Sequence, residues 1–208
     1  MGSFGANTII GLSCAVGFGV HLFTRKWCKS AGYINEKPLQ ELCQFLDAAN
    51  IDLKSFDDRV YAKLNAGKLE PILNTLKILK ENNVWVEITN LIVPNWTDSL
   101  DMIRKMCRWL VANGLEDCPL HFSRFHPQYK LKQLPPTPVG ILEQARKTAI
   151  ENGMKFAYVG NMPGTQYEDT FCPECQKVLI ERKGYRIIQN HIHNSLCGFC
   201  TAPVAGVW

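Results

Sequence analysis

Strand-like and helix-like segments alternate through most of this chain, and that alternation restricts the possible folds more than any other feature. Short runs rich in apolar and β-branched residues cover 48–54, 84–93, 120–125 and 155–160. Segments with helical character lie before or between them, at 38–47, 69–83, 99–114 and 139–153. Strands that alternate with helices in this way form parallel sheets with helical crossovers. The sequence therefore predicts an α/β fold, either an open parallel sheet or part of a (β/α) barrel.

The number of predicted strands points to an incomplete structure. A closed barrel of this type needs about eight parallel strands, whereas four are visible here. The edges of an open sheet can also pair with another chain. We therefore expect an incomplete (β/α) barrel, a dimer, or a part of a longer protein.

The first 29 residues are apolar and glycine-rich, and we assign them to no domain. Residues 8–23 carry no formal charge and are followed by Arg25 and Lys26. A membrane span needs about twenty apolar residues, and a signal peptide carries its positive charge ahead of the apolar run. We expect a buried strand or a poorly structured start, and no membrane segment.

Composition excludes some partners and favours one compartment. The net charge is only +4, and no basic run is interleaved with aromatic residues, so nucleic acid is not an expected partner. Nine cysteines are an odd number for a secreted disulfide framework. A reducing cytoplasm fits this chain best.

Polar residues follow several of the predicted strands. They are Asp52 and Lys54; Ser123, Arg124 and His126; and Asn161. Sites in parallel α/β folds lie where the strands end. Lysine and arginine can donate to an anionic group, and an aspartate can receive an amine. We expect a site for an anionic or zwitterionic small molecule at this rim.

The C-terminal segment contains two Cys-x-x-Cys pairs separated by 21 residues. These are Cys172 with Cys175, and Cys197 with Cys200. Four thiolates at this spacing are typical of a tetrahedral zinc ribbon, and iron in a rubredoxin-like site is the main alternative. The insert contains a predicted hairpin at 178–188, with its turn at Lys183 and Gly184. Four protein ligands leave no open position on the metal, so the site is predicted to be structural.

At the family level, the chain resembles the radical SAM enzymes of the AmmeMemoRadiSam system, which are related to pyruvate formate-lyase activating enzyme. The resemblance runs from about residue 33 to 208 and is carried by DAANIDLKSFDDRVYAKL, LEPILNTLKILKENNVWVEITNLIVP, SRFHPQYKLKQLPPTP, YVGNMPG and the closing CPECQKVLIERKGY and CGFCTAPVAGVW. It implies a radical SAM (β/α) barrel half at 30–170 and a four-cysteine metal ribbon at 171–208. It also implies S-adenosylmethionine and a [4Fe–4S] cluster as cofactors, with Asp52, Lys54 and His126 as contacts of S-adenosylmethionine.

One departure from the family pattern limits the functional prediction. Radical SAM enzymes hold their cluster with Cys-x-x-x-Cys-x-x-Cys, and this sequence contains no such triplet. The chain thus resembles the C-terminal half of such an enzyme. We expect a radical SAM family protein that is inactive alone, or half of a split enzyme completed by a second chain. The alternative is a zinc-ribbon scaffold or interaction protein without catalytic activity. The substrate is not readable from the sequence.

Overall fold

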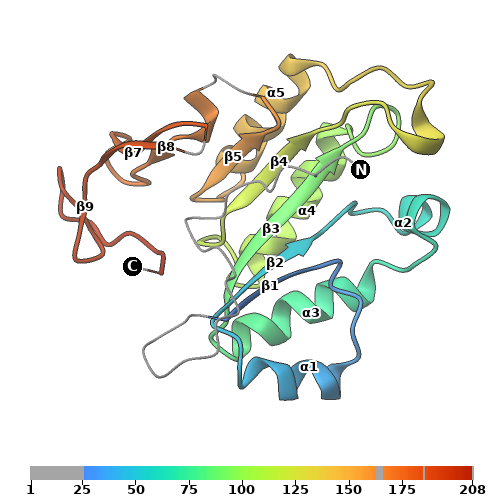
Figure 1. Ribbon diagram of the computed structural model, residues 1–208, viewed down its shortest axis with the longest axis horizontal. Coiled ribbons are helices and arrows are strands. Elements are labelled where there is room, and N and C mark those ends of the chain that lie inside the picture. Colours follow the sequence, from blue (N-terminus) through green and yellow to red (C-terminus); the bar gives the residue numbers. More distant parts are fainter. Residues whose placement is uncertain (1–25, 163–165, 185, 208) are drawn as a thin grey trace.

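Five parallel strands form the main sheet, and they are arranged in the order in which they occur along the chain. The computed structural model describes residues 26–162, 166–184 and 186–207. The strands are β1 (Trp27–Ser30), β2 (Ala48–Asp52), β3 (Trp85–Ile92), β4 (Leu120–Arg124) and β5 (Ala157–Gly160). Strand order without a reversal is the winding of a (β/α) barrel, since doubly wound sheets reverse their order at a switch point. Figure 1 shows the sheet as an open layer, as the sequence predicts.

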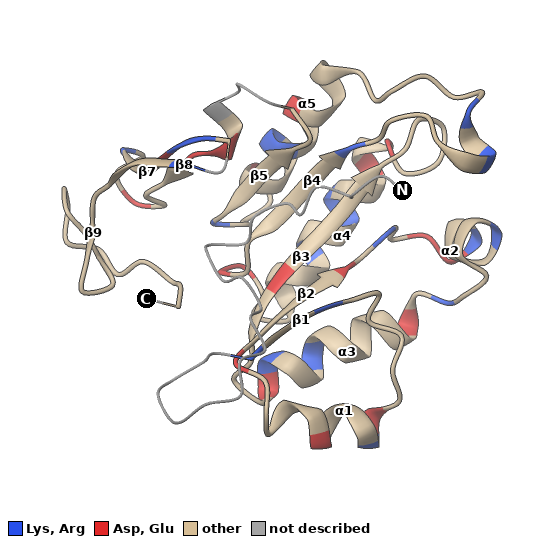
Figure 2. Cartoon of the chain, in the orientation of Figure 1, with Lys and Arg blue, Asp and Glu red and all other residues tan. Residues whose placement is uncertain are grey.

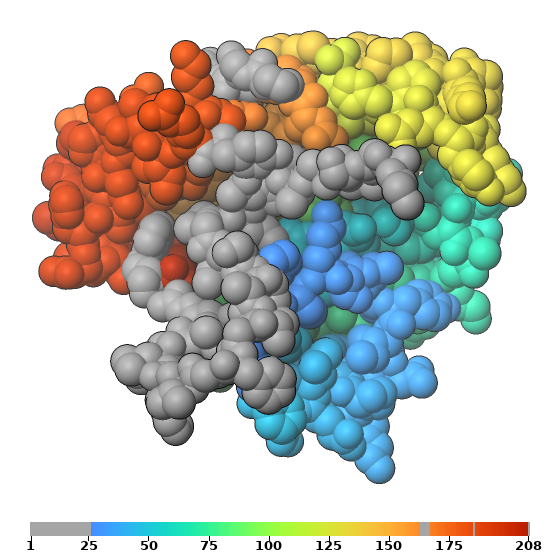
Figure 3. All heavy atoms as spheres, viewed as in Figure 1, coloured from blue at the N-terminus to red at the C-terminus, as the bar shows by residue number. Residues whose placement is uncertain are grey.

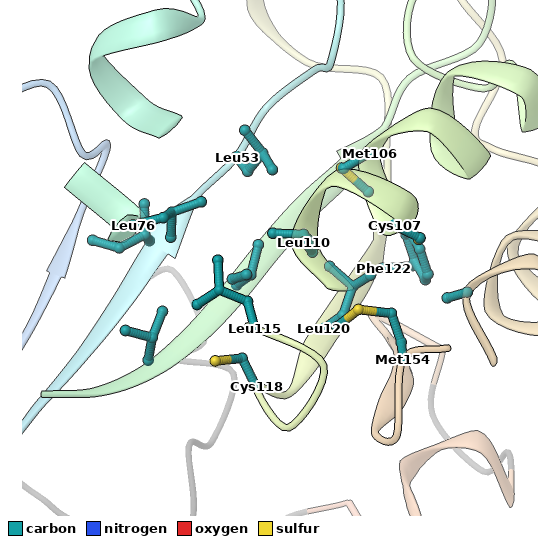
Figure 4. Packing of buried hydrophobic residues seen from close by; sticks show 14 of the residues in the cluster. Leu53, Leu76, Met106, Cys107, Leu110, Leu115, Cys118, Leu120, Phe122 and Met154 are labelled. Carbon is teal, nitrogen blue, oxygen red and sulfur yellow. The ribbon is translucent and has the colours of Figure 1, made fainter. Parts of the chain in front are cut away.

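Within the described ranges, five α-helices accompany the sheet, and the apolar sides of α3, α4 and α5 pack on one of its faces. They are α1 (Glu36–Cys43), α2 (Asp58–Asn65), α3 (Glu70–Glu81), α4 (Leu100–Ala112) and α5 (Val139–Glu151). Helix residues such as Leu76 and Leu110 are fully buried against strand residues such as Ile88 and Phe122. Figure 4 shows Leu110, Leu115, Leu120 and Phe122 meeting in this core.

A small appendage follows the sheet. It contains η2 (Gln166–Glu168), the antiparallel strands β6 (Thr170–Phe171), β7 (Val178–Lys183) and β8 (Arg186–Asn190), and a pair formed by β9 (Ile192–His193) and β10 (Leu196–Cys197). The β7–β8 hairpin confirms the one predicted at 178–188. The appendage has its own core, in which Phe156 from the main sheet side packs on Leu179 and Ile180. Figure 3 shows it as a lobe beside the last part of the sheet.

The loop after β4 and the expectation of no membrane segment can be compared with these elements directly. The loop that follows β4 contains only the short helix η1 (Tyr129–Leu131), in keeping with its prolines. No helix within the described ranges is long and apolar enough to cross a membrane. The uncharged run at 8–23 lies outside those ranges.

Candidate functional site

The four C-terminal cysteines meet at one point of the appendage. Their sulfur atoms all lie within 4.8 Å of one another. Cys172 Sγ is 3.7 Å from Cys200 Sγ, and Cys175 Sγ is 3.8 Å from Cys197 Sγ. A tetrahedral ion with metal–sulfur bonds of about 2.3 Å places its sulfurs about 3.8 Å apart. The group can therefore hold one metal ion, as the spacing in the sequence predicts.

Backbone N–H groups beside the four sulfur atoms favour the thiolate form of the cysteines. The Cys175 N–H donates to Cys172 Sγ at 3.5 Å, and the Phe199 N–H donates to Cys197 Sγ at 3.4 Å. Burial opposes ionisation of Cys197, but amide donors from Phe199 and Cys200 and the neighbouring thiols lower its pKa to about 6. The lowered pKa favours the thiolate form of Cys197, and the thiolate is the form that ligates metals.

The chemistry of this group is that of a closed structural site. Four thiolates complete a tetrahedron and leave no position for a substrate. Cys172 and Cys197 are buried in the small core of the appendage. Both zinc and iron accept four sulfur ligands, so the geometry alone does not separate them.

No second cysteine cluster accompanies it in the described part of the chain. The four-cysteine group is the only set of three or more Cys, His, Asp or Glu residues there that can share an ion. Burial raises the pKa of Cys107 and of Cys118 to about 12. These two thiols belong to the apolar core and are not prepared as ligands.

The sheet face opposite the helix-packed core carries polar side chains, and we call it the polar face. It consists of Asn50, Asp52, Glu87, Thr89, His121, Ser123 and Tyr158. These positions alternate with apolar ones such as Ile51, Ile88 and Phe122, which point into the core. Strands in all-parallel sheets are usually apolar on both faces. An acidic position interrupts β3 in Figure 2, and this departure marks the face as a candidate site.

Side chains on the polar face contact one another across strands in two groups. Thr89 Oγ1 donates to Asn50 Oδ1 at 3.0 Å. His121 Nε2 lies 3.2 Å from Glu87 Oε2, and Glu87 is only 4% exposed. The His121 ring stacks on Tyr158 with centroids 5.2 Å apart. Glu87 is a buried carboxylate and His121 a partly exposed imidazole, so this pair is the candidate reactive group of the polar face.

The predicted rim residues are only partly brought together. Lys54 Nζ contacts Asp52 Oδ2 at 3.0 Å, and the Lys54 N–H donates to the Tyr61 hydroxyl. Arg124 Nε instead donates to the Thr137 carbonyl. The pair of Asp52 and Lys54 lies at the end of β2, whose last residue is Asp52 on the polar face.

The other predicted rim residues are separated from that pair. Asn161 Nδ2 donates to the Arg124 carbonyl at 3.2 Å. Ser123 is buried on the polar face. His126 is exposed in the loop after β4 and makes no hydrogen bond to the described residues. The roles of Asp52, Lys54 and His126 in cofactor binding remain predictions.

The sequence contains a signal for the polar face that strand ends alone do not reveal. Polar residues at 50 and 52, 87 and 89, and 121 and 123 follow a strict period of two. A period of two predicts strands with one apolar and one polar face. The pairing of Glu87 with His121 cannot be read from that pattern, because it depends on the register between β3 and β4.

Comparison with known proteins identifies the fold. No family model matches the chain. Its sheet resembles a domain of pyruvate-formate lyase-activating enzyme from Bacteroides vulgatus, with a TM-score of 0.57, 16% identity, and coverage of 66% of this chain and 81% of that one. The fold is that of radical SAM enzymes. A radical SAM methyltransferase from Sphaerobacter thermophilus gives a TM-score of 0.52 with 14% identity, over 64% of this chain and 39% of that one.

A sequence relative extends the similarity beyond the fold. An uncharacterized protein of Methanocaldococcus jannaschii is 45% identical over 171 residues, which are 81% of this chain and 50% of that protein. The chain therefore spans about half the length of the curated relative that it matches.

Proposed function

We propose that this chain binds S-adenosylmethionine at the Asp52–Lys54 end of the polar face and belongs to the radical SAM enzymes of the AmmeMemoRadiSam system. The observation that carries the proposal is the contact between Asp52 and Lys54 at the end of β2, beside a polar face, in a radical SAM fold. Proteins of this fold place their sites where parallel strands end.

The residues present fit the methionine part of S-adenosylmethionine. That molecule presents an ammonium, a carboxylate and a sulfonium. Asp52 can accept from the ammonium, and Lys54 can donate to the carboxylate. Their side chains are 25% and 39% exposed, so a ligand can reach them without opening the core. His126 would approach from the loop after β4.

The cysteines of this chain do not fit a [4Fe–4S] cluster of the radical SAM type. The sequence has no Cys-x-x-x-Cys-x-x-Cys triplet, and the sulfur distances in the appendage match one ion. No radical step is therefore assigned to residues of this chain. A cluster would come from a second chain that completes the barrel, and a homodimer is the other arrangement that the open sheet permits.

The appendage would hold zinc or iron at Cys172, Cys175, Cys197 and Cys200. A closed thiolate site supplies folding free energy and no substrate chemistry. Thiolate sites persist in reducing compartments, so we place the protein in the cytoplasm. The single metal group also favours a second candidate, a metal-ribbon scaffold without catalytic activity.

Calorimetric titration with S-adenosylmethionine tests the proposal. We expect saturable binding to the wild-type chain and binding at least about tenfold weaker to Asp52→Asn, because the variant loses a charge-assisted contact of roughly 1.5–3 kcal/mol. Asp101→Asn is the matched control, since Asp101 pairs with Lys105 on the exposed side of α4. A wild-type chain that retains its metal but binds no S-adenosylmethionine would support the scaffold instead.

A further inference from the structure

A pocket of about 260 Å³ lies between helix α5, the start of β5 and the four-cysteine appendage. Its wall includes Ile150 and Met154 from the α5 side and Phe171 and Cys172 from the appendage. It is thus distinct from the rim near Asp52. The two parts of the chain form it together.

Arg146 of α5 lines this pocket in a fixed orientation. Its Nε donates to the Ala157 carbonyl at 2.9 Å. Its guanidinium carbon lies 5.5 Å from the centre of the Tyr167 ring and 5.6 Å from that of Phe171. Two aromatic contacts and one hydrogen bond hold the guanidinium in place, and four of its five N–H donors remain for other partners.

Within the described ranges, no carboxylate pairs with this cation. Among the described residues, no Asp or Glu oxygen lies within 4.0 Å of Arg146. The residues outside the described ranges contain no Asp or Glu at all. Burial also lowers the pKa of Arg146. A half-buried charge in these surroundings carries a desolvation cost that an anion would offset.

The other charged groups of the wall are already engaged. Lys155 Nζ pairs with Asp117 Oδ1 at 2.8 Å. Asp169 Oδ1 accepts from the Arg182 N–H at 2.6 Å. Asp169 still carries negative charge in the wall, which disfavours a doubly charged ligand such as a phosphate monoester. The remaining lining combines apolar side chains such as Met154 and Phe171 with the polar residues Tyr158 and Gln176.

We propose that this pocket binds a small organic monocarboxylate, with its carboxylate on the free guanidinium N–H groups of Arg146 and its apolar body against Phe171 and Met154. Arginine recognises carboxylates through two parallel hydrogen bonds. The volume of about 260 Å³ holds roughly nine groups of the size of a water molecule, at about 30 Å³ each. A benzoate-sized molecule matches that space.

Because of the location of the pocket, a bound ligand would affect how the appendage packs against the sheet. A molecule bound there contacts both α5 and Phe171, which directly precedes Cys172. If the ligand binds only while the appendage is packed against α5, it would stabilise that packing by mass action. This inference does not depend on S-adenosylmethionine binding, which is proposed at the Asp52–Lys54 end of β2.

Amide NMR of the metal-loaded chain, titrated with sodium benzoate, tests the inference. We expect saturable shifts at Gly153, Ala157 and Phe171, and none of them with benzamide, the neutral molecule of the same shape. Arg146→Gln should weaken benzoate binding at least about tenfold. Arg104→Gln is the matched control, since Arg104 pairs with Asp101 on α4.

Three results would overturn the inference. The first is no saturable shift with benzoate in the wild-type chain. The second is equal binding of benzamide, which would show an apolar pocket that ignores charge. The third is unchanged benzoate affinity in Arg146→Gln. If that variant loses the fold of the appendage, the comparison of benzoate with benzamide on the wild-type chain still decides.

Discussion

Gly198 shows how a single residue controls whether the four cysteines can meet. It lies between Cys197 and Cys200, and its N–H donates to the His191 carbonyl at 2.8 Å. A β-carbon at this position would lie 2.7 Å from that same carbonyl oxygen. Because the contact is with backbone, the chain itself would have to shift. Cys-Gly-x-Cys is therefore a steric requirement here as well as a sequence motif.

Substitution Gly198→Ala should weaken the appendage. The crowding against His191 is expected to cost about 1–3 kcal/mol of unfolding free energy and to release metal at lower chelator concentration. Competition with a chromogenic chelator measures the release. Gly140→Ala is the control, because nothing lies within 4 Å of a β-carbon there. Equal metal retention in the two variants would contradict the prediction.

The buried thiols predict how stability changes at alkaline pH. Burial raises the pKa of Cys107 to about 12 in the folded chain, from an ordinary value of 9.0. The stabilisation is complete below about pH 9, where the thiol is neutral in both states, and is lost as pH rises towards 12.

Cys107→Ala isolates this effect. The wild-type unfolding free energy should fall faster between pH 9 and 12 than that of the variant, by up to about 1.4 kcal/mol per pH unit. Urea unfolding at a series of pH values measures both slopes. Parallel slopes would show that the thiol ionises as easily in the folded chain as in the unfolded one.

At the scale of elements, the segments with a clear apolar pattern are predictable, whereas β1 and α2 are not. The helices at 69–83, 99–114 and 139–153 are confirmed as α3, α4 and α5, which bury one apolar side each. The sequence pattern does not predict β1 or α2. β1 has four residues, two of them exposed. Its parallel pairing with β2 stabilises a strand that its composition does not indicate.

Helix α2 is short, and its start is marked by a local signal. Asp57 Oδ1 accepts from the Arg59 N–H at 2.8 Å, as an N-cap does. The side chain and backbone of Arg59 lower the pKa of Asp57 to about 2. Only Tyr61 of this helix is buried, so an apolar period gives little indication of it.

The folding of the appendage should depend on metal binding by the four cysteines. Its own core contains six buried residues, two of which are the ligands Cys172 and Cys197. Removal of the ion leaves too little apolar burial to hold β7 and β8. Hydrogen exchange after chelation should show loss of protection in β7 and β8, with β3 and β4 unchanged. Retained protection in β7 would contradict a metal-dependent appendage.

At the scale of the whole molecule, the chain separates an apolar face, a polar face and a four-cysteine end. Cysteine spacing reveals the metal group because its four ligands come from two local pairs. The rim is predictable only in part. Asp52 and Lys54 are close in sequence, so their contact follows from local structure. The position of His126 depends on the path of a proline-rich loop. Contacts between strands, such as Glu87 with His121, require the register of the sheet.

We expect the cysteines of this chain to hold one structural ion and no iron–sulfur cluster. Quantifying zinc, iron and acid-labile sulfide per chain, after anaerobic purification and a reconstitution attempt, tests it most directly. The expected result is about one ion of zinc or iron per chain and no sulfide. About four irons with matching sulfide would contradict it, because scattered cysteines would then assemble a cluster.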